Sequence, residues 1–300
     1  MTDSRGVRNT RYGVIDVGTN TIRLLVSEIV DGMPMPIVTD KVLIRLGRDV
    51  DRDGRFSEET IGQAVRTLAR FVGRTEEFGC DHLRVIGTSA SREAENGGDF
   101  AARAKSAIGM ELEIIDEDEE ARLAFVGAMN ALVEPWEGDV GVVDVGGGST
   151  EIVVGSHKQG IGWSHSYRLG SGRLTDLYIE HDPPTPVELR RVRRAIEETL
   201  PAVGEVPHPQ HATAVAGSAS NLRRMVGPLL DLEALNRALR LLCDEPADLV
   251  GRAFGIDPER ARLLPAGAMI LHAVQVRLGE PLWFSKGGIR EGAVLEMARG

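Results

Sequence analysis

The chain has 300 residues, of which 42% are hydrophobic and 27% are charged. This composition is ordinary for a globular protein, and the length favours two domains over one. The formal net charge of −10 argues against broad, unspecific binding of DNA or RNA. It does not exclude a small polyanionic substrate, because a binding site can be locally basic.

The two cysteines and the N-terminus indicate the compartment. Cys80 and Cys243 lie far apart in the sequence, which predicts reduced thiols rather than a structural disulfide. The opening stretch MTDSRGVRNTRYG holds no apolar segment of signal-peptide type, and no apolar run is long enough to cross a bilayer. We therefore expect a cytoplasmic protein without membrane attachment.

The first half of the chain alternates between strand and helix patterns. Ser57 is expected to cap an amphipathic helix whose first turn is acidic. The expected elements are, in order, strands over 11–18, 21–32 and 36–47, a helix over 57–79, a strand running into a polar loop over 82–92, a helix over 98–109, a strand over 110–116 and a helix over 117–132.

The second half opens with a similar pattern and becomes more helical. Thr185, Pro186 and Glu188 form the pattern of a capping box at the start of a helix. The expected elements are, in order, a strand, glycine-rich turn and strand over 139–155, a strand over 162–170, a helix over 185–200, a strand, turn and helix over 212–225, helices within 231–279 interrupted at Pro246, Pro258 and Pro265, and a strand, turn and helix over 281–300.

Two segments of the chain share one layout. VIDVGTNTIRLLVSEI and VVDVGGGSTEIVVG each place an aspartate and a glycine before a small polar turn and an apolar strand. Their aspartates, Asp16 and Asp144, lie 128 residues apart, which is about the size of one domain. The repeat predicts two related halves.

The repeated turn is suited to hold phosphate. It has no G-K-[ST] sequence and does not open a long helix, which argues against a P-loop. No G-x-G-x-x-G precedes a helix, which argues against a dinucleotide-binding fold. Glycines between strands can nevertheless direct several backbone N–H groups at one anion. The preceding aspartates cannot attract phosphate, so their expected role is to hold a hydrated Mg²⁺. A plain hairpin turn is the alternative for either copy alone, and the presence of two copies favours a phosphate site between the domains.

An ordered set of motifs carries a family resemblance. DVGTNTIRLL, GTSASREA, DEDEEARLAF, DVGGGSTEIV, HDPPT, VAGSASNL and GGIREG follow one another along the chain. In this set the chain resembles the exopolyphosphatase and guanosine pentaphosphate phosphohydrolase family (Ppx/GppA), which belongs to the actin-like ATPase, sugar kinase and Hsp70 superfamily. The resemblance implies an α/β fold of two ribonuclease H-like domains with an interdomain cleft. We expect the first domain to span 1–130, with the helix at about 289–300 packing back on it, and the second to span 131–300.

The resemblance also implies the site residues. Glu120 matches the catalytic base, and Arg92 matches the arginine that grips phosphate. The predicted metal ligands are Asp16, Asp144 and Glu151, and the predicted cofactor is Mg²⁺ or another divalent cation. The residues predicted to bind phosphate are Gly18, Thr19, Asn20, Thr21, Arg23, Gly146, Gly147, Gly148, Ser149, Thr150, Gly217, Ser218 and Arg290.

Physical chemistry is consistent with these roles but leaves alternatives open. Glu120 can deprotonate a water, and Arg92 can bind two phosphate oxygens at once. Without the resemblance, Glu119 and Glu120 would be interpreted as a solvated acidic first turn, and Arg92 as the partner of a neighbouring glutamate. Arg23 and Arg290 could equally form structural ion pairs.

The expected activity is the Mg²⁺-assisted hydrolysis of the terminal phosphate of inorganic polyphosphate. Many family members carry a further C-terminal helical region that helps to bind long polymer. The chain ends at Gly300 without it, so short chains are the expected substrates. The alternatives are a guanosine pentaphosphate 5′-phosphohydrolase, an ATP-dependent kinase and a non-enzymatic alarmone- or polyphosphate-binding regulator. We expect a homodimer that binds no nucleic acid.

Overall fold

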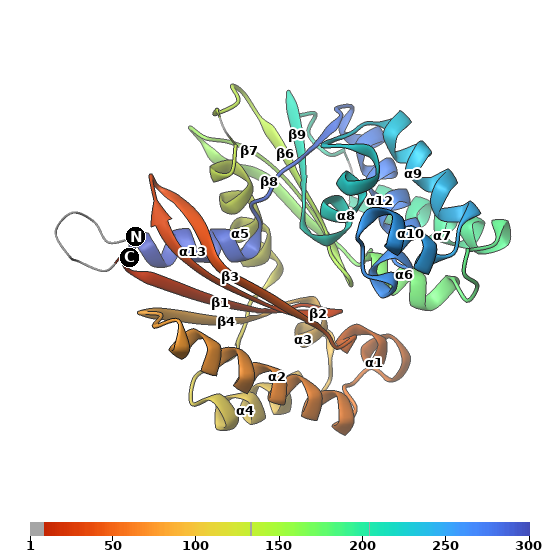
Figure 1. Ribbon diagram of the computed structural model, residues 1–300. Helices are drawn as coiled ribbons and strands as arrows, with labels where there is room; N and C mark the ends of the chain where they lie inside the picture. Colours follow the sequence, from red (N-terminus) through yellow and green to blue (C-terminus); the bar gives the residue numbers. More distant parts are fainter. Residues whose placement is uncertain (1–8, 133, 204) are drawn as a thin grey trace. The chain divides into compact units, whose positions relative to one another are not determined.

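The computed structural model describes residues 9–132, 134–203 and 205–300 (Figure 1). The chain forms two compact units. Unit 1 comprises the described residues up to Asn130 together with Ile289–Gly300, and unit 2 comprises Ala131–Gly288.

Unit 1 is built on a five-stranded mixed sheet with the strand order β3-β2-β1-β4-β5. β1, β2 and β3 pair antiparallel, whereas β4 and β5 run parallel to β1. Its elements are β1 (Arg11–Val17), β2 (Thr21–Val30), β3 (Met33–Leu43), α1 (Leu46–Asp53), α2 (Glu58–Glu77), β4 (His82–Gly87), α3 (Ser89–Glu93), α4 (Gly97–Ile108), β5 (Glu113–Ile114), α5 (Glu117–Asn130) and α13 (Ile289–Arg299).

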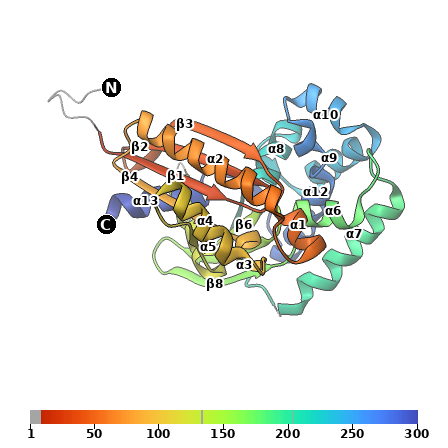
Figure 2. The ribbon, with the colours of Figure 1, turned by 90° about the horizontal axis from the view of Figure 1, so that it is seen from below.

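Helices cover both faces of the unit 1 sheet (Figures 1 and 2). Ile15 of β1 is buried in a cluster with residues of α2 and α4. Val14 is buried instead with Leu123 of α5 and Val294 of α13. Because side chains alternate along a strand, Asp16 lies on the α5 and α13 side of the sheet.

Unit 2 contains a six-stranded mixed sheet with the strand order β10-β11-β9-β6-β7-β8. β6, β7 and β8 pair antiparallel, and β9 runs parallel to β6. Its elements are β6 (Val140–Val145), β7 (Thr150–Ser156), β8 (Gly160–Tyr167), α6 (Ser171–Tyr178), α7 (Pro186–Thr199), the 3₁₀ turn η1 (Leu200–Val203), β9 (His211–Val215), α8 (Ala216–Val226), β10 (Leu229–Leu230), α9 (Leu232–Asp244), α10 (Ala247–Phe254), α11 (Pro258–Ala261), α12 (Leu264–Leu278) and β11 (Leu282–Phe284).

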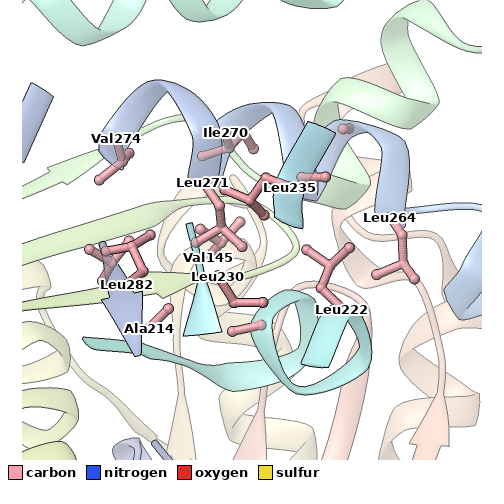
Figure 3. Packing of buried hydrophobic residues seen from close by; sticks show 14 of the residues in the cluster. Val145, Ala214, Leu222, Leu230, Leu235, Leu264, Ile270, Leu271, Val274 and Leu282 are labelled. Atoms are coloured by element: carbon pink, nitrogen blue, oxygen red, sulfur yellow. The ribbon is translucent and has the colours of Figure 1, made fainter. Parts of the chain in front are cut away.

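The main core of unit 2 lies between its sheet and a layer of helices. Val145 of β6 and Ala214 of β9 pack with Leu222 of α8, Leu235 of α9 and Leu271 of α12 (Figure 3). Each of these side chains is at most 1% exposed. These helices therefore pack on the face of the unit 2 sheet opposite to Asp144, because the side chains of Asp144 and Val145 point to opposite faces of β6.

The two units share one topology. In each, three antiparallel strands are followed by a parallel strand that pairs with the first: β4 with β1 in unit 1, and β9 with β6 in unit 2. The internal repeat inferred from the sequence is confirmed at the level of the sheets.

Most of the predicted elements are confirmed, including both helix caps. The side chain of Ser57 accepts a hydrogen bond from the N–H of Thr60, and Thr185 and Glu188 form a capping box. Two predictions were wrong: the strand expected over 36–47 ends at Leu43 and is followed by α1, and the loop after β4 contains α3. The interruptions expected at Pro246, Pro258 and Pro265 are confirmed, because each proline lies at the start of a new helix. A proline is tolerated there because the first helical N–H groups have no partner within the helix.

Candidate functional site

Two loops of the same construction connect the first two strands of each unit. Loop 1 (residues 18–21) follows β1, and the N–H of Gly18 donates to the carbonyl of Thr21 at 3.1 Å. Loop 2 (residues 146–149) follows β6, and the N–H of Gly146 donates to the carbonyl of Ser149 at 3.0 Å. The loops predicted to bind phosphate therefore share one turn geometry, in which Thr21 corresponds to Ser149.

The residues at the start of α1 hold the carbonyl groups of loop 1. The N–H groups of Ile44 and Arg45 donate to the carbonyl of Asn20 at 2.9 and 3.0 Å, and the N–H of Gly47 donates to that of Thr19 at 2.8 Å. A Cβ atom at Gly47 would lie 2.1 Å from Cγ2 of Thr19, so a larger residue would force the Thr19 side chain to shift.

The start of α6 holds loop 2 in the same manner. Ser171 donates its N–H and its hydroxyl to the carbonyl of Gly146, both at 3.0 Å. The backbone N–H of Arg173 donates to the carbonyl of Gly147 at 2.9 Å, and its side-chain Nη1 donates to the carbonyl of Gly148 at 3.0 Å. A Cβ atom at Gly170 would lie 2.2 Å from the carbonyl oxygen of Gly147.

These contacts orient the amide hydrogens of both loops. In a trans peptide the C=O and the following N–H point in opposite directions, so a carbonyl bound to the helix turns the next N–H away from it. In the described part of the chain, no hydrogen bond is found from the amides of Thr19, Asn20, Gly147 and Gly148. Each loop thus has backbone N–H groups without a partner among the described residues, which an anion-binding turn requires.

Four residues that support the loops were not predicted from the sequence: Gly47, Gly170, Ser171 and Arg173. A signal for them was present, because the tripeptide Arg-Leu-Gly follows the third strand of each unit, at residues 45–47 and 168–170. Its glycine makes the close approach to the loop in both units.

Asp16 is buried beside two guanidinium groups of unit 1. It lies opposite Arg23 in the register of β1 and β2, with 4.0 Å between its Oδ2 and Nη1 of Arg23. Burial raises the pKa of Asp16, and the positive charges of Arg23 and Arg290 partly oppose this rise. Arg290 also donates to the carbonyl of Leu24 at 3.4 Å. The structure therefore brings together three predicted site residues: Asp16, Arg23 and Arg290.

Asp144 lies opposite a second acid in unit 2. Its register partner on β7 is Glu151, and directly opposite residues of antiparallel strands have Cβ atoms about 5 Å apart. Both side chains are buried, and Ser166 donates its hydroxyl to Oε1 of Glu151 at 2.8 Å. Two predicted metal ligands are thus neighbours on one face of the sheet.

Glu120 and Arg92 are in direct contact within unit 1. Nη1 of Arg92 lies 2.7 Å from Oε2 of Glu120 and also donates to the carbonyl of Ile115 at 2.9 Å. Glu120 is only 4% exposed, although four acids occupy the first turn of α5. The sequence alone also allowed Glu120 to be a solvated residue of an acidic first turn. Its burial excludes that interpretation.

Glu119 belongs to a different set of contacts. Arg122 binds both of its carboxylate oxygens, at 2.8 and 2.9 Å, and Arg84 donates to it at 3.2 Å. Both arginines also contact Glu296 of α13. Glu119 therefore joins α5 to β4 and α13, whereas Glu120 faces Arg92.

The junction of β9 with α8 is strained and lies beside Asp144. Val215 pairs with Asp144, and the next residue, Ala216, has a φ of 62°. A positive φ in a residue with a Cβ atom costs about 1 kcal/mol or more, and such strain concentrates at functional sites. Gly217 and Ser218 follow, and the hydroxyl of Ser218 donates to the carbonyl of Val145 at 3.2 Å.

The hydroxyl groups of Ser149 and Thr150 differ in their surroundings. Ser149 lies in the loop itself, whereas Thr150 is the first residue of β7 and is fully buried. The hydroxyl of Thr150 donates to the carbonyl of Leu169. Its proton thus has a structural partner, and phosphate binding by Thr150 stays a prediction.

The donor set of unit 2 fits a magnesium ion. Mg²⁺ is commonly bound by one or two carboxylates, with water and substrate phosphate as its other ligands. Asp144 and Glu151 supply such a pair. Among the described residues, no three His, Cys, Asp or Glu side chains form a complete metal site, so a cation held here would need these further ligands.

A sequence model of the Ppx/GppA phosphatase family matches residues 25–299. The chain belongs to this family. It is 32% identical to Exopolyphosphatase 2 of Mycobacterium tuberculosis over 96% of this chain and 99% of the relative. It is 30% identical to Exopolyphosphatase 1 of Mycobacterium bovis, over 95% and 87% of the two chains. The crystal structure of an exopolyphosphatase from Cytophaga hutchinsonii is 27% identical and gives a TM-score of 0.87, covering 97% of this chain and 98% of that chain.

These findings confirm the family resemblance and the expectation that this Ppx/GppA protein is a hydrolase. They also confirm the α/β fold with two sheets of ribonuclease H-like topology. The cleft and the roles of the site residues stay predictions. No helix in the described ranges is both long and apolar enough to span a membrane.

Proposed function

We propose that the protein is an exopolyphosphatase that removes the terminal phosphate of inorganic polyphosphate. The observation that carries the proposal is the contact of the buried Glu120 carboxylate with the partly buried Arg92, 2.7 Å apart, in a member of a phosphatase family. A carboxylate held beside a phosphate-binding guanidinium suits the transfer of a phosphoryl group to water. The names of the similar mycobacterial proteins agree with this substrate.

The loops are proposed to bind the substrate. Amide hydrogens of Thr19 and Asn20 in loop 1, and of Gly147 and Gly148 in loop 2, would donate to phosphate oxygens. Arg23 and Arg290 would add positive charge beside loop 1. The binding of one substrate by both loops stays a prediction from the sequence.

Asp144 and Glu151 would hold the divalent cation. When bound, the cation neutralises charge that develops on the phosphate oxygens. Asp16 is a less suitable ligand, because the guanidinium groups of Arg23 and Arg290 compete with a cation for its carboxylate.

Glu120 is proposed to act as the general base. Its carboxylate accepts a proton from water while the water oxygen bonds to the terminal phosphorus. The anhydride bond to the next phosphate breaks, and its electron pair leaves with the shortened chain. General-base assistance of this kind typically raises a rate by about 10²–10⁴-fold.

The test is phosphate release from short polyphosphate, long polyphosphate, guanosine pentaphosphate and ATP, with and without Mg²⁺. We expect Mg²⁺-dependent release from polyphosphate and a loss of about 10²–10⁴-fold in kcat for Glu120→Gln. Glu119→Gln is the matched control, because the neighbouring carboxylate contacts Arg84 and Arg122 and should leave kcat nearly unchanged.

Other outcomes would support other functions. Turnover of guanosine pentaphosphate alone would make the protein a pentaphosphate phosphohydrolase. Turnover of ATP only with an acceptor would indicate a kinase, and binding without turnover would indicate a regulator. Equal rates for Glu120→Gln and the wild type would exclude Glu120 as the base. Light scattering of the purified protein would test the expected homodimer.

A further inference from the structure

One side of α7 carries a row of exposed arginines. The opposite side of the helix, with Val192 and Ile196, is buried in the main core of unit 2. The exposed residues, which we call the α7 arginine face, are Arg190, Arg191, Arg193 and Arg194.

Several charges along α7 are placed against helix stability. Glu188 in the first turn has the sign that the helix dipole favours, but Glu197 and Glu198 lie near the C-terminal end, where the dipole disfavours acids. Arg190 and Arg194 are like charges four residues apart, which destabilises a helix. The ion pair of Arg194 with Glu198, at 2.6 Å, has the less favourable order, with the base first.

Other exposed helices of the same unit have the favourable order. In α9, Glu233 precedes Arg237 by four residues and pairs with it at 2.6 Å. In α10, Asp248 precedes Arg252 in the same way, at 3.2 Å. The charge order of α7 is therefore not shared by these other helices of unit 2. Since this order does not stabilise the helix, we expect the arginines to serve another purpose.

Most of the α7 arginine face lacks an acidic partner. Within the described residues, no hydrogen bond or ion pair is found for Arg190, Arg191 or Arg193. Arg193 lies near another basic group, His272, whose pKa is lowered by burial and by that arginine. The face thus concentrates positive charge on a protein whose formal net charge is −10.

The helix is attached to the element that holds loop 2. Glu188, in the first turn of α7, accepts hydrogen bonds from the N–H groups of Glu180 and His181 at 2.8 and 3.1 Å, just beyond the end of α6. The other end of α6 binds loop 2 through Ser171. A helix of eight residues, about 12 Å long, therefore links the loop to the start of α7.

We propose that the α7 arginine face binds phosphates of a polyphosphate chain beyond those at the catalytic residues. The inference rests on the proposed function, which supplies a polyanion long enough to reach a second surface. Arginine binds phosphate oxygens through two parallel hydrogen bonds. Attachment at a second surface strengthens the binding of long chains and leaves the shortest ones unaffected.

The test compares two triple variants that each remove three positive charges from unit 2. Arg190→Gln/Arg191→Gln/Arg193→Gln neutralises the face, and Arg237→Gln/Arg240→Gln/Arg252→Gln removes exposed arginines elsewhere. For the first variant we expect KM for long polyphosphate to rise about tenfold, with kcat and KM for tripolyphosphate within about twofold of wild type. The control variant should match the wild type for both substrates, and the KM of the face variant should depend less on salt.

Binding measurements separate this proposal from the proposed function. In the Glu120→Gln background, the face variant should bind long polyphosphate about tenfold more weakly than the control variant. Equal binding by the two triple variants would overturn the proposal. The proposal would also be overturned if the face variant lost binding only to RNA or to anionic lipid vesicles and kept its binding to long polyphosphate. If the wild type releases no phosphate from polyphosphate, the proposed function fails, and the binding comparison still decides the role of the face.

Discussion

Arg23 and Glu151 occupy the same position in the two repeats, each directly opposite the aspartate that precedes a loop. Arg23 is the register partner of Asp16, and Glu151 is that of Asp144. One repeat therefore pairs an acid with a base, and the other pairs two acids. Since like charges at this distance repel, the second pair is the one that a cation would stabilise.

This difference predicts separate effects of two substitutions. Glu151→Gln should raise the Mg²⁺ concentration needed for half-maximal activity by about 10- to 100-fold, because one carboxylate ligand is lost. Arg23→Gln should leave the Mg²⁺ requirement unchanged and raise KM about tenfold, because a charge-assisted contact to phosphate is lost. Phosphate release measured against Mg²⁺ at several substrate concentrations distinguishes the two. If Arg23→Gln shifted the Mg²⁺ requirement and Glu151→Gln did not, Asp16 would be the metal ligand.

The contact of Arg92 with Glu120 predicts that lysine is a poor replacement. Arg92→Lys keeps the charge but cannot bind the carbonyl of Ile115, the carboxylate of Glu120 and a phosphate in one fixed plane. We expect kcat to fall about 10- to 100-fold, because the base loses its fixed position. Arg122→Lys is the control, since Arg122 contacts Glu119 on the same helix. A rise in KM with unchanged kcat would show that Arg92 only binds substrate.

The strongly periodic parts of the fold were predictable from the sequence. The helix after Ser57 and the capping box at Thr185 follow from local hydrogen bonding and amphipathic spacing, and both are confirmed. The helix α1 was not predictable in this way. It is preceded by Arg45, a non-glycine residue with a φ of 61°, and the N–H of Gly47 in its first turn donates to the carbonyl of Thr19 in loop 1, a contact that local propensity does not contain.

The loops of the candidate site could be predicted from the sequence, but the residues that hold their carbonyl groups could not. Repeated aspartate and glycine positions identify loops 1 and 2, and a buried Glu120 beside Arg92 could be inferred only through the family. The approach of Gly47 and Gly170 to the loops is a tertiary contact between residues more than twenty positions apart. Only the repeated Arg-Leu-Gly tripeptide hints at it.

That close approach predicts the effect of adding one methyl group. Gly170→Ala would place a Cβ atom 2.2 Å from the carbonyl oxygen of Gly147, so loop 2 must shift. We expect a rise of at least tenfold in KM for polyphosphate, because the amide donors lose their alignment. Gly73→Ala is the control: no atom lies within 4 Å of its added Cβ in α2, and the change should stabilise the protein by about 0.5–1 kcal/mol. Unchanged kinetics for Gly170→Ala would show that loop 2 does not bind substrate.

Glu188 predicts a pH-dependent contribution to the stability of unit 2. Burial alone would raise its pKa, but hydrogen bonds from His181, Thr185 and the N–H of Glu180 outweigh it and hold the pKa well below its ordinary value of 4.5. The unfolded chain therefore binds more protons than the folded one as pH falls below about 4.5, and this stabilisation is present above that pH and lost below it.

Glu188→Gln should thus lower the free energy of unfolding by about 2 kcal/mol at neutral pH, because several N–H and hydroxyl donors lose a charged, buried acceptor. The difference from wild type should shrink as pH falls below 4.5, the ordinary pKa of this side chain. Urea unfolding at a series of pH values measures it. Glu198→Gln is the control on the same helix, since an exposed ion pair contributes about 0.5 kcal/mol or less. A pH-independent difference between Glu188→Gln and wild type would mean that the hydrogen bonds of Glu188 stabilise unit 2 without help from its charge.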